Sequence, residues 1–236
     1  MQLFYNPNIT ETDTTFNFDK DESKHIVKVL RKKNGNRLNI TNGKGWLFTA
    51  ELNIADLKHC SVSIISKIVQ PKRNYNLHLA VAPTKMNDRY EWFLEKATEI
   101  GIESITPIIC DRSERKVVKT ERFEKIIQAA MKQSLQCYLP KLNAPIPFKD
   151  FIKQPFFGQR FMAHCEETQK KSLKSQLQMG KDCVILIGPE GDFSVKEIET
   201  ALHHNFIAVT LGSTRLRTET AAIAACHSVA FLNETL

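Results

Sequence analysis

The sequence predicts an α/β protein in which helices cover both faces of a parallel sheet, preceded by a smaller domain of short strands. Predicted strands alternate with predicted helices from residue 75 onward, which is the pattern of a parallel sheet. Residues 184–187 are apolar without alternation, as expected for a strand buried on both faces. Closely spaced strand candidates in residues 1–70 are typical of a compact β-barrel. We therefore expect domains over 1–70 and 75–236, separated by the polar stretch 71–74.

The amino-terminal domain contains four strand candidates and one short helix. Strands are expected over residues 17–19, 37–41, 46–52 and 60–69, where β-branched and aromatic residues gather. A helix is expected over 23–30, because apolar residues at 26, 27 and 30 fit one face.

The positive charge of the chain is concentrated in this domain. The formal net charge of the whole chain is +7, and residues 23–50 contain seven basic residues and no acid. Solvated lysines often serve solubility, but a stretch without compensating acids favours a polyanion partner, most simply nucleic acid. The basic residues are Lys24, Lys28, Arg31, Lys32, Lys33, Arg37 and Lys44.

The first half of the second domain shows regular alternation. A strand is expected over 77–82, followed by a helix that Asn87 or Asp88 caps and that ends before Gly101. The next strand is expected over 105–110. Thr120 is then expected to cap a helix whose apolar stripe continues to residue 138, and a strand over 161–164 follows.

Two similar units close the chain. The strand at 184–187 runs into Gly188-Pro189-Glu190-Gly191, and Ser194 with Glu197 forms a predicted capping box that opens a helix. A second strand over 207–211 leads into a polar loop and a helix over 218–233. In open α/β sheets ligands bind at this edge, so we expect both loops to converge on one ligand.

The loops IGPEGDF and LGSTRLRTETAA resemble the signature loops of ribosomal RNA uridine-N3 methyltransferases of the SPOUT superfamily. Residues 25–31 and 95–101 fit the same family. Two positions depart from it: Asp192 replaces a second consecutive glycine and puts a negative charge beside the loop, and a longer apolar side chain is missing near Thr214. The resemblance implies a PUA-like RNA-binding barrel, a carboxy-terminal trefoil knot and S-adenosylmethionine as cofactor.

The resemblance also implies roles for individual residues. Arg217 would stabilise negative charge on the uracil base or hold a phosphate, and Glu190 would accept the N3 proton or tie its loop together. The cofactor-binding residues are expected to be Leu186, Ile187, Gly188, Gly191, Leu211, Gly212, Leu216, Thr218 and Ala221. The RNA contacts are expected to be Lys24, Arg31, Lys32, Arg112 and Arg115.

The expected partner is 16S ribosomal RNA within the small ribosomal subunit. Small residues at 221, 222, 224 and 225 would let the last helix pack closely in a homodimer or within the fold. We expect a cytoplasmic protein, because no apolar run approaches the roughly 20 residues of a membrane helix, and we expect no metal site. Two alternatives stay open: a phosphate- or nucleotide-binding α/β enzyme, and a non-catalytic RNA-binding protein.

Overall fold

The computed structural model describes residues 2–167 and 169–234. The chain divides into two compact units. The first runs to Lys72 and includes Met131–Leu139, and the second comprises Arg73–Ala130 and Pro140–Leu236. The return of residues 131–139 to the first unit has no counterpart in the sequence prediction.

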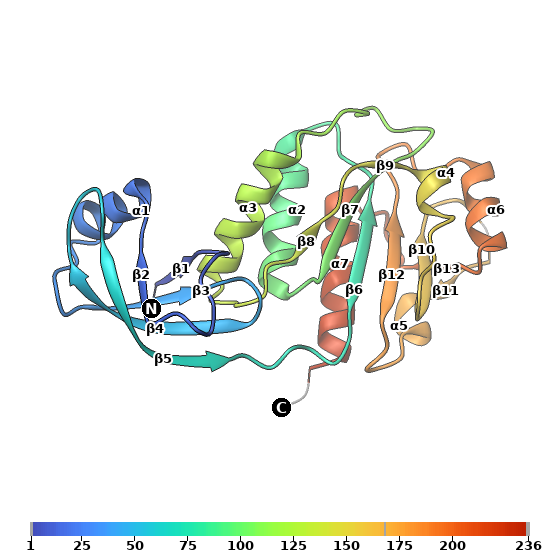
Figure 1. Cartoon of the computed structure of the whole chain (residues 1–236). Coiled ribbons are helices and arrows are strands. Elements are labelled where there is room, and N and C mark those ends of the chain that lie inside the picture. The colour runs from blue at the N-terminus through green and yellow to red at the C-terminus, as the bar shows by residue number, and fades with distance from the viewer. Residues whose placement is uncertain (1, 168, 235–236) are drawn as a thin grey trace. The chain divides into compact units, whose positions relative to one another are not determined.

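The first unit is built on a five-stranded sheet with the order β1-β3-β4-β5-β2 (Figure 1). β1 pairs with β3 in parallel, and the other neighbours are antiparallel. Large side chains such as Phe4, Ile40 and Phe48 fill its core. The strands are β1 (Leu3–Tyr5), β2 (Thr15–Asn17), β3 (Arg37–Thr41), β4 (Trp46–Ile54) and β5 (Ser61–Val69).

The sequence predicted β3, β4 and β5 to within two residues at each end. β2 begins two residues before the predicted 17–19, and β1 was not predicted. β1 has only three residues, and it is stabilised as a strand by its pairing with β3, more than thirty residues away in the sequence.

The helical segment of the first unit differs from the single predicted helix. α1 (Lys20–Lys24) is capped by Asp19, whose carboxylate accepts a hydrogen bond from the backbone N–H of Glu22 at 2.8 Å. A π-helical turn, η1 (His25–Val29), follows directly and buries Ile26 completely. Arg31 then takes a left-handed backbone conformation with φ +52°.

The second unit contains a parallel sheet with the order β11-β13-β10-β12-β6-β7-β8, and β9 also pairs with β7 (Figure 1). Ile185 at its centre is level with Phe161 on one side and Leu79 on the other. The strands are β6 (Leu77–Val81), β7 (Ser104–Ile109), β8 (Lys141–Leu142), β9 (Ile146–Pro147), β10 (Gln159–Ala163), β11 (Lys171–Ser172), β12 (Cys183–Ile187) and β13 (Ile207–Thr210).

Helices cover both faces of this sheet, as predicted. α7 packs against α2, β6 and β12 on one face. On the other face, side chains of α4 and α6 form a core cluster with Val184 and Leu186 of β12. The helices are α2 (Asn87–Ile100), α3 (Thr120–Gln133), α4 (Phe148–Phe151), α5 (Leu173–Gln176), α6 (Val195–His203) and α7 (Thr218–Leu232). Within the described residues, no helix combines the length and apolarity needed to cross a membrane.

Two predicted helix ends were wrong and one was right. The N-cap of α2 is Met86, which makes no side-chain cap bond, so Asn87 is already helical. α3 ends at Gln133 rather than near residue 138, and Leu135 beyond it is left-handed with φ +59°. Gly101 ends α2 as predicted, because its φ of +112° is one that a side chain disfavours. The trefoil knot stays a prediction.

Candidate active site

The loop after β12 is held by short-range bonds that the sequence predicted. The Ser194 hydroxyl accepts a hydrogen bond from the Glu197 backbone N–H at 3.3 Å, and the Glu197 carboxylate accepts one from the Ser194 N–H at 2.8 Å. This capping box fixes the start of α6. It also anchors the loop after β7, because Glu197 accepts the Asp111 N–H at 3.0 Å and Ser194 donates to the Asp111 carboxylate at 2.6 Å.

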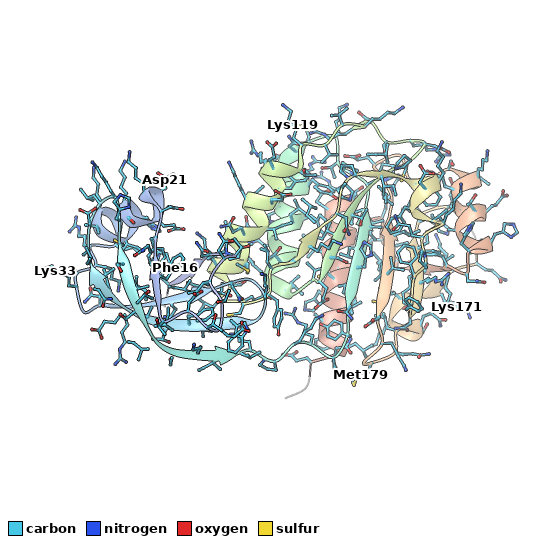
Figure 2. All side chains as sticks on the ribbon, in the orientation of Figure 1. Phe16, Asp21, Lys33, Lys119, Lys171 and Met179 are labelled. Atoms are coloured by element: carbon cyan, nitrogen blue, oxygen red, sulfur yellow. The ribbon has the colours of Figure 1, made fainter. Side chains whose placement is uncertain are left out.

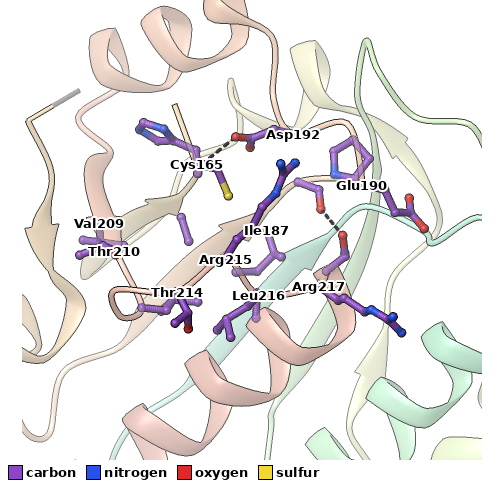
Figure 3. A pocket seen from close by; sticks show the side chains of 17 residues that line it. Cys165, Ile187, Glu190, Asp192, Val209, Thr210, Thr214, Arg215, Leu216 and Arg217 are labelled. Atoms are coloured by element: carbon purple, nitrogen blue, oxygen red, sulfur yellow. Dashed lines mark hydrogen bonds between the residues drawn. The ribbon is translucent and has the colours of Figure 1, made fainter. Parts of the chain in front are cut away.

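The loop after β13 meets the loop after β12 because of the strand order. β10 lies between β13 and β12, so the carboxyl ends of three strands lie side by side. The hydroxyl of Thr218, at the start of α7, donates to the carbonyl of Gly188 at 3.1 Å and links the two loops directly (Figure 3).

A cavity of about 400 Å³ opens where these loops meet (Figure 3). Its volume lies within the range of small-molecule sites in proteins. Apolar side chains supply much of its wall, and a few charged groups from the loops complete it. The apolar lining residues include Ala163, Ile187, Val209, Leu211, Leu216 and Ala221.

Most of the predicted site residues line this cavity. The predicted residues in the lining are Ile187, Gly188, Glu190, Leu211, Leu216, Arg217, Thr218 and Ala221. Leu186, Gly191 and Gly212 are not in the described lining. Leu186 faces the core under α6, because side chains alternate along β12. A Cβ on Gly191 would lie 3.2 Å from the Cβ of Arg112, so this glycine permits close packing of two loops.

The two predicted catalytic residues have different surroundings. The Oε1 atom of Glu190 accepts a hydrogen bond from the backbone N–H of Lys85 at 2.9 Å. Its Oε2 atom is buried and has no partner among the described residues. The side chain of Arg217 is exposed, and its guanidinium has no hydrogen-bond or ion-pair partner within the described part of the chain. The Arg217 carbonyl accepts the N–H of Ala221 at 2.7 Å, and in Figure 3 the side chain points away from the cavity that the residue lines.

Besides the loops after β12 and β13, the cavity has a third wall, residues 163–165 at the end of β10, which the sequence analysis missed. His164 is 7% exposed, and both of its ring nitrogens lack a hydrogen-bond partner among the described residues. Burial, reinforced by the nearby Lys170 cation, lowers the pKa of His164, which favours a neutral ring. Cys165 beside it is exposed. No glycine or charge pattern marks this segment, so only the position of β10 in the sheet reveals it.

Comparisons with known proteins identify the family. A model of the RNA methyltransferase domain matches residues 71–230, and a model of the RNA methyltransferase PUA domain matches residues 18–65. The chain is 31% identical to ribosomal RNA small subunit methyltransferase E of Rickettsia conorii, with 98% of this chain and 95% of that one covered. The chain belongs to this RNA methyltransferase family.

Solved structures of relatives share the whole fold. A "probable rRNA-methyltransferase" from Porphyromonas gingivalis is 40% identical with a TM-score of 0.92, over 99% of this chain and 98% of that one. Ribosomal RNA small subunit methyltransferase E from Neisseria gonorrhoeae, bound to S-adenosyl methionine, is 26% identical with a TM-score of 0.88 over the same shares. The fold expected from the resemblance, a PUA-like domain followed by a parallel α/β methyltransferase domain, is thereby confirmed.

In the methyltransferase domain, the two arginines predicted to contact RNA also hold loops together. Arg112 donates to the carbonyl of Gly191 at 3.0 Å and lies 3.7 Å from the carboxylate of Glu166. Arg115 donates to the carbonyl of Lys85 at 2.9 Å and to the side chain of Asn87. Their guanidinium groups therefore position the loop after β7 beside the cavity, and their contact with RNA stays a prediction.

In the PUA-like domain, the basic segment faces solvent. Lys24 and Arg31 are exposed and Lys32 is half-buried. Lys33 projects outward from the same segment (Figure 2). The π-helical turn and the left-handed Arg31 together give this segment its path. Their contact with RNA also stays a prediction.

Proposed function

We propose that this protein is an S-adenosylmethionine-dependent methyltransferase that modifies N3 of a uridine in 16S ribosomal RNA of the small ribosomal subunit. The observation that carries the proposal is the meeting of two glycine loops over one cavity at the carboxyl edge of the sheet. Membership of the RNA methyltransferase family supports the reaction class.

The cavity suits an adenosyl ligand. Gly188 lines the cavity, and glycine there lets the loop pack against the buried Phe193, since a Cβ would lie only 3.0 Å from its ring. Ile187, Leu211 and Leu216 offer an apolar surface to a flat base. The unpartnered nitrogens of His164 and the Oε2 atom of Glu190 are polar groups that a ligand could satisfy. S-adenosylmethionine supplies an electrophilic methyl group on a sulfonium.

The chain's own residues align the reaction and manage charge. Methyl transfer is an in-line displacement, so rigid loops contribute by fixing the geometry of approach. Uridine N3 carries a proton at neutral pH, and we assign its removal to Glu190. Arg217, whose guanidinium has no partner among the described residues, stabilises the negative charge that develops on the base.

RNA binding is assigned to the basic segment of residues 23–50, and we retain 1–70 and 75–236 as the functional domains. A homodimer in the cytoplasm completes the proposal. Ala222 and Ala225 of the small-residue face are buried within the chain itself, so this face of α7 packs inside the fold and a subunit contact would use the exposed side of the helix. The exposure of Phe231 on α7 and of Trp92 on α2 supports an additional packing partner for these helices.

A methylation assay tests the proposal directly. The protein is incubated with labelled S-adenosylmethionine and small ribosomal subunits that lack 16S methylation, and nucleosides are identified by mass spectrometry. We expect 3-methyluridine. Methylation at another base atom would refute the N3 assignment, and donor binding without transfer would favour a non-catalytic RNA-binding protein. Calorimetric binding of ATP in place of the methyl donor would favour the nucleotide-enzyme alternative.

A further inference from the structure

Asp192 lies in the cofactor loop in a backbone conformation that side chains rarely adopt. Its φ is +63°, and its own N–H donates to the carbonyl of Pro189 at 2.9 Å. Aspartate is among the few residues that tolerate this region, but glycine would adopt it with less strain. A side chain retained at such a position is expected to make compensating contacts.

The carboxylate of Asp192 makes two such contacts. One oxygen, Oδ1, accepts the N–H of Phe193 at 2.8 Å, within its own loop. The other, Oδ2, accepts the N–H of Cys165 at 2.7 Å, on the segment that follows β10. This second bond connects the loop after β12 to the third wall of the cavity, and Asp192 itself lines that cavity.

The third wall depends on few other bonds to hold its place. Lys170 closes the turn from within, because its ammonium donates to the carbonyls of His164 at 3.0 Å and Glu166 at 2.7 Å. Arg112 reaches Glu166 across 3.7 Å with both side chains substantially exposed, so this ion pair contributes little. Among the described residues, the hydrogen bond from the Cys165 N–H to the Asp192 carboxylate links the backbone of the third wall to the cofactor loop.

We propose that Asp192 is a positioning residue for the methyl donor, which holds residues 164 and 165 as the third wall of the cavity through its bond to the Cys165 N–H. The inference rests on the proposed function and adds a residue whose contribution is to donor affinity rather than to transfer. The hydrogen bond from the Cys165 N–H to the Asp192 carboxylate stabilises the third wall in the position that binds the donor. Because a hydrogen bond to a charged group contributes more than a neutral one, its loss should weaken donor binding about tenfold.

Two substitutions at Asp192 distinguish the effect of its carboxylate hydrogen bonds from the effect of its left-handed backbone. Asp192→Gly removes both acceptor oxygens and relieves the left-handed strain, so thermal stability is expected to be retained. Asp192→Asn keeps one acceptor oxygen and a residue tolerant of this conformation. Asp182→Asn is the matched control, because Asp182 likewise accepts a backbone N–H, that of Asn76 at 2.7 Å, but precedes β12 and does not line the cavity.

Calorimetry with S-adenosylmethionine gives the first readout. We expect donor affinity to fall about tenfold in Asp192→Gly, less in Asp192→Asn, and little in Asp182→Asn. In the methylation assay, the KM for the donor should rise in Asp192→Gly while kcat at saturating donor changes little. A merely structural role would lower stability and kcat together.

The thiol of Cys165 provides a second readout that needs no RNA. Cys165 is exposed and the other five cysteines are buried, so a thiol reagent such as dithionitrobenzoate reports on this wall. In wild type, S-adenosylmethionine should slow the reaction of Cys165. In Asp192→Gly the thiol should react faster without donor and be protected only at higher donor concentration.

Three results would overturn the inference. One is wild-type donor affinity and wild-type thiol reactivity in Asp192→Gly, and another is an equal loss of affinity in Asp182→Asn. The third is wild-type protein that binds no methyl donor at all, which removes the proposed function as well. Donor binding that is normal in wild type and unchanged in Asp192→Gly removes this inference alone.

Discussion

Glu190 shows how one side chain can serve the loop and the chemistry at once. Its Oε1 atom is occupied by the Lys85 N–H, so the side chain cannot swing freely. Its Oε2 atom is buried beside the cavity and has no partner among the described residues. A carboxylate held by one oxygen presents the other in a fixed direction, which is what a general base requires.

We therefore expect Glu190→Gln to lower turnover at least about 100-fold while donor affinity stays largely unchanged. Glutamine retains the carbonyl oxygen that accepts the Lys85 N–H, so the loop should keep its shape. What it loses is the capacity to take the N3 proton. The measurements are single-turnover methylation of small subunits and calorimetry with the donor.

Glu114→Gln is a matched control for this substitution, because Glu114 also contacts Lys85, through its ammonium at 2.9 Å. Glu114 is half-exposed and does not line the cavity. Turnover should be normal in this variant. If Glu190→Gln also retained normal turnover, Glu190 would be a loop tie and the base would have to be sought elsewhere.

At the scale of elements, the capping box of Ser194 and Glu197 fixes the start of α6. Ser194→Ala removes the acceptor for the Glu197 N–H and the bond to Asp111. We expect a loss of about 1 kcal/mol in unfolding free energy, or a fall in Tm of about 2–4 °C. Ser172→Ala is the control: Ser172 is the N-cap of α5 but makes no side-chain cap bond, so its loss should leave Tm nearly unchanged. Equal shifts in both variants would show that the capping box contributes nothing.

Arg31, which we propose contacts RNA, occupies a backbone conformation that costs stability. Its left-handed backbone is unfavourable for arginine by about 1–2 kcal/mol. We expect Arg31→Gly to leave the unfolding free energy unchanged or raise it by up to about 1 kcal/mol, since glycine's chain entropy offsets part of the relief. RNA binding should weaken, and its salt dependence should fall by about one counterion.

Arg37→Gly removes the same charge from β3 and serves as the comparison. Glycine in a strand lowers stability by about 0.5–1 kcal/mol, the opposite direction from position 31. Thermal unfolding and filter binding at several salt concentrations distinguish the two. An Arg31→Gly protein that binds RNA as wild type does would remove Arg31 from the interface.

Local signals predicted the elements well, and distant contacts account for the errors. The capping box at Ser194 and the left-handed Gly101 are properties of a few neighbouring residues, so the sequence reveals them. α3 ends at Gln133, earlier than its apolar stripe suggests, and the residues that continue the stripe belong to the first unit. The turn η1 buries Ile26, and periodicity alone predicts an ordinary helix there.

At the scale of the whole molecule, the site was half predictable. The loops after β12 and β13 carry glycines and were found, whereas residues 163–165 carry no such mark. They reach the cavity only because β10 is inserted between β12 and β13 in the sheet. Strand order depends on pairings between distant segments, and no pattern within one segment encodes it.

Acid stability also belongs to this scale. Burial lowers the pKa of His78 on β6 to about 4, and its ring bonds to the Thr106 hydroxyl at 2.7 Å. Between pH 6.5 and 4 the unfolded chain binds a proton there that the folded chain does not, so stability falls as pH falls through this window. The resulting loss in unfolding free energy is about 3 kcal/mol; it is complete below pH 4 and absent above pH 6.5.

We expect the unfolding free energy of His78→Gln to depend less steeply on pH than that of wild type between 6.5 and 4. Urea titrations at intervals across this range provide the measurement. The exposed His203 gives the comparison, and His203→Gln should follow the wild-type curve. Parallel curves for wild type and His78→Gln would mean that folding does not lower the pKa of His78.

The insertion of β12 between β6 and β10 has a consequence for how the protein is made. β6 ends at Val81, but the partner beside it begins at Cys183, about a hundred residues later. A ribosome must therefore translate most of the chain before the central pairs of the sheet can form, and such non-local pairing is slow. During that interval the apolar edge of β6 stays unpaired in the nascent polypeptide, which makes this strand the segment that chaperones would be expected to shield.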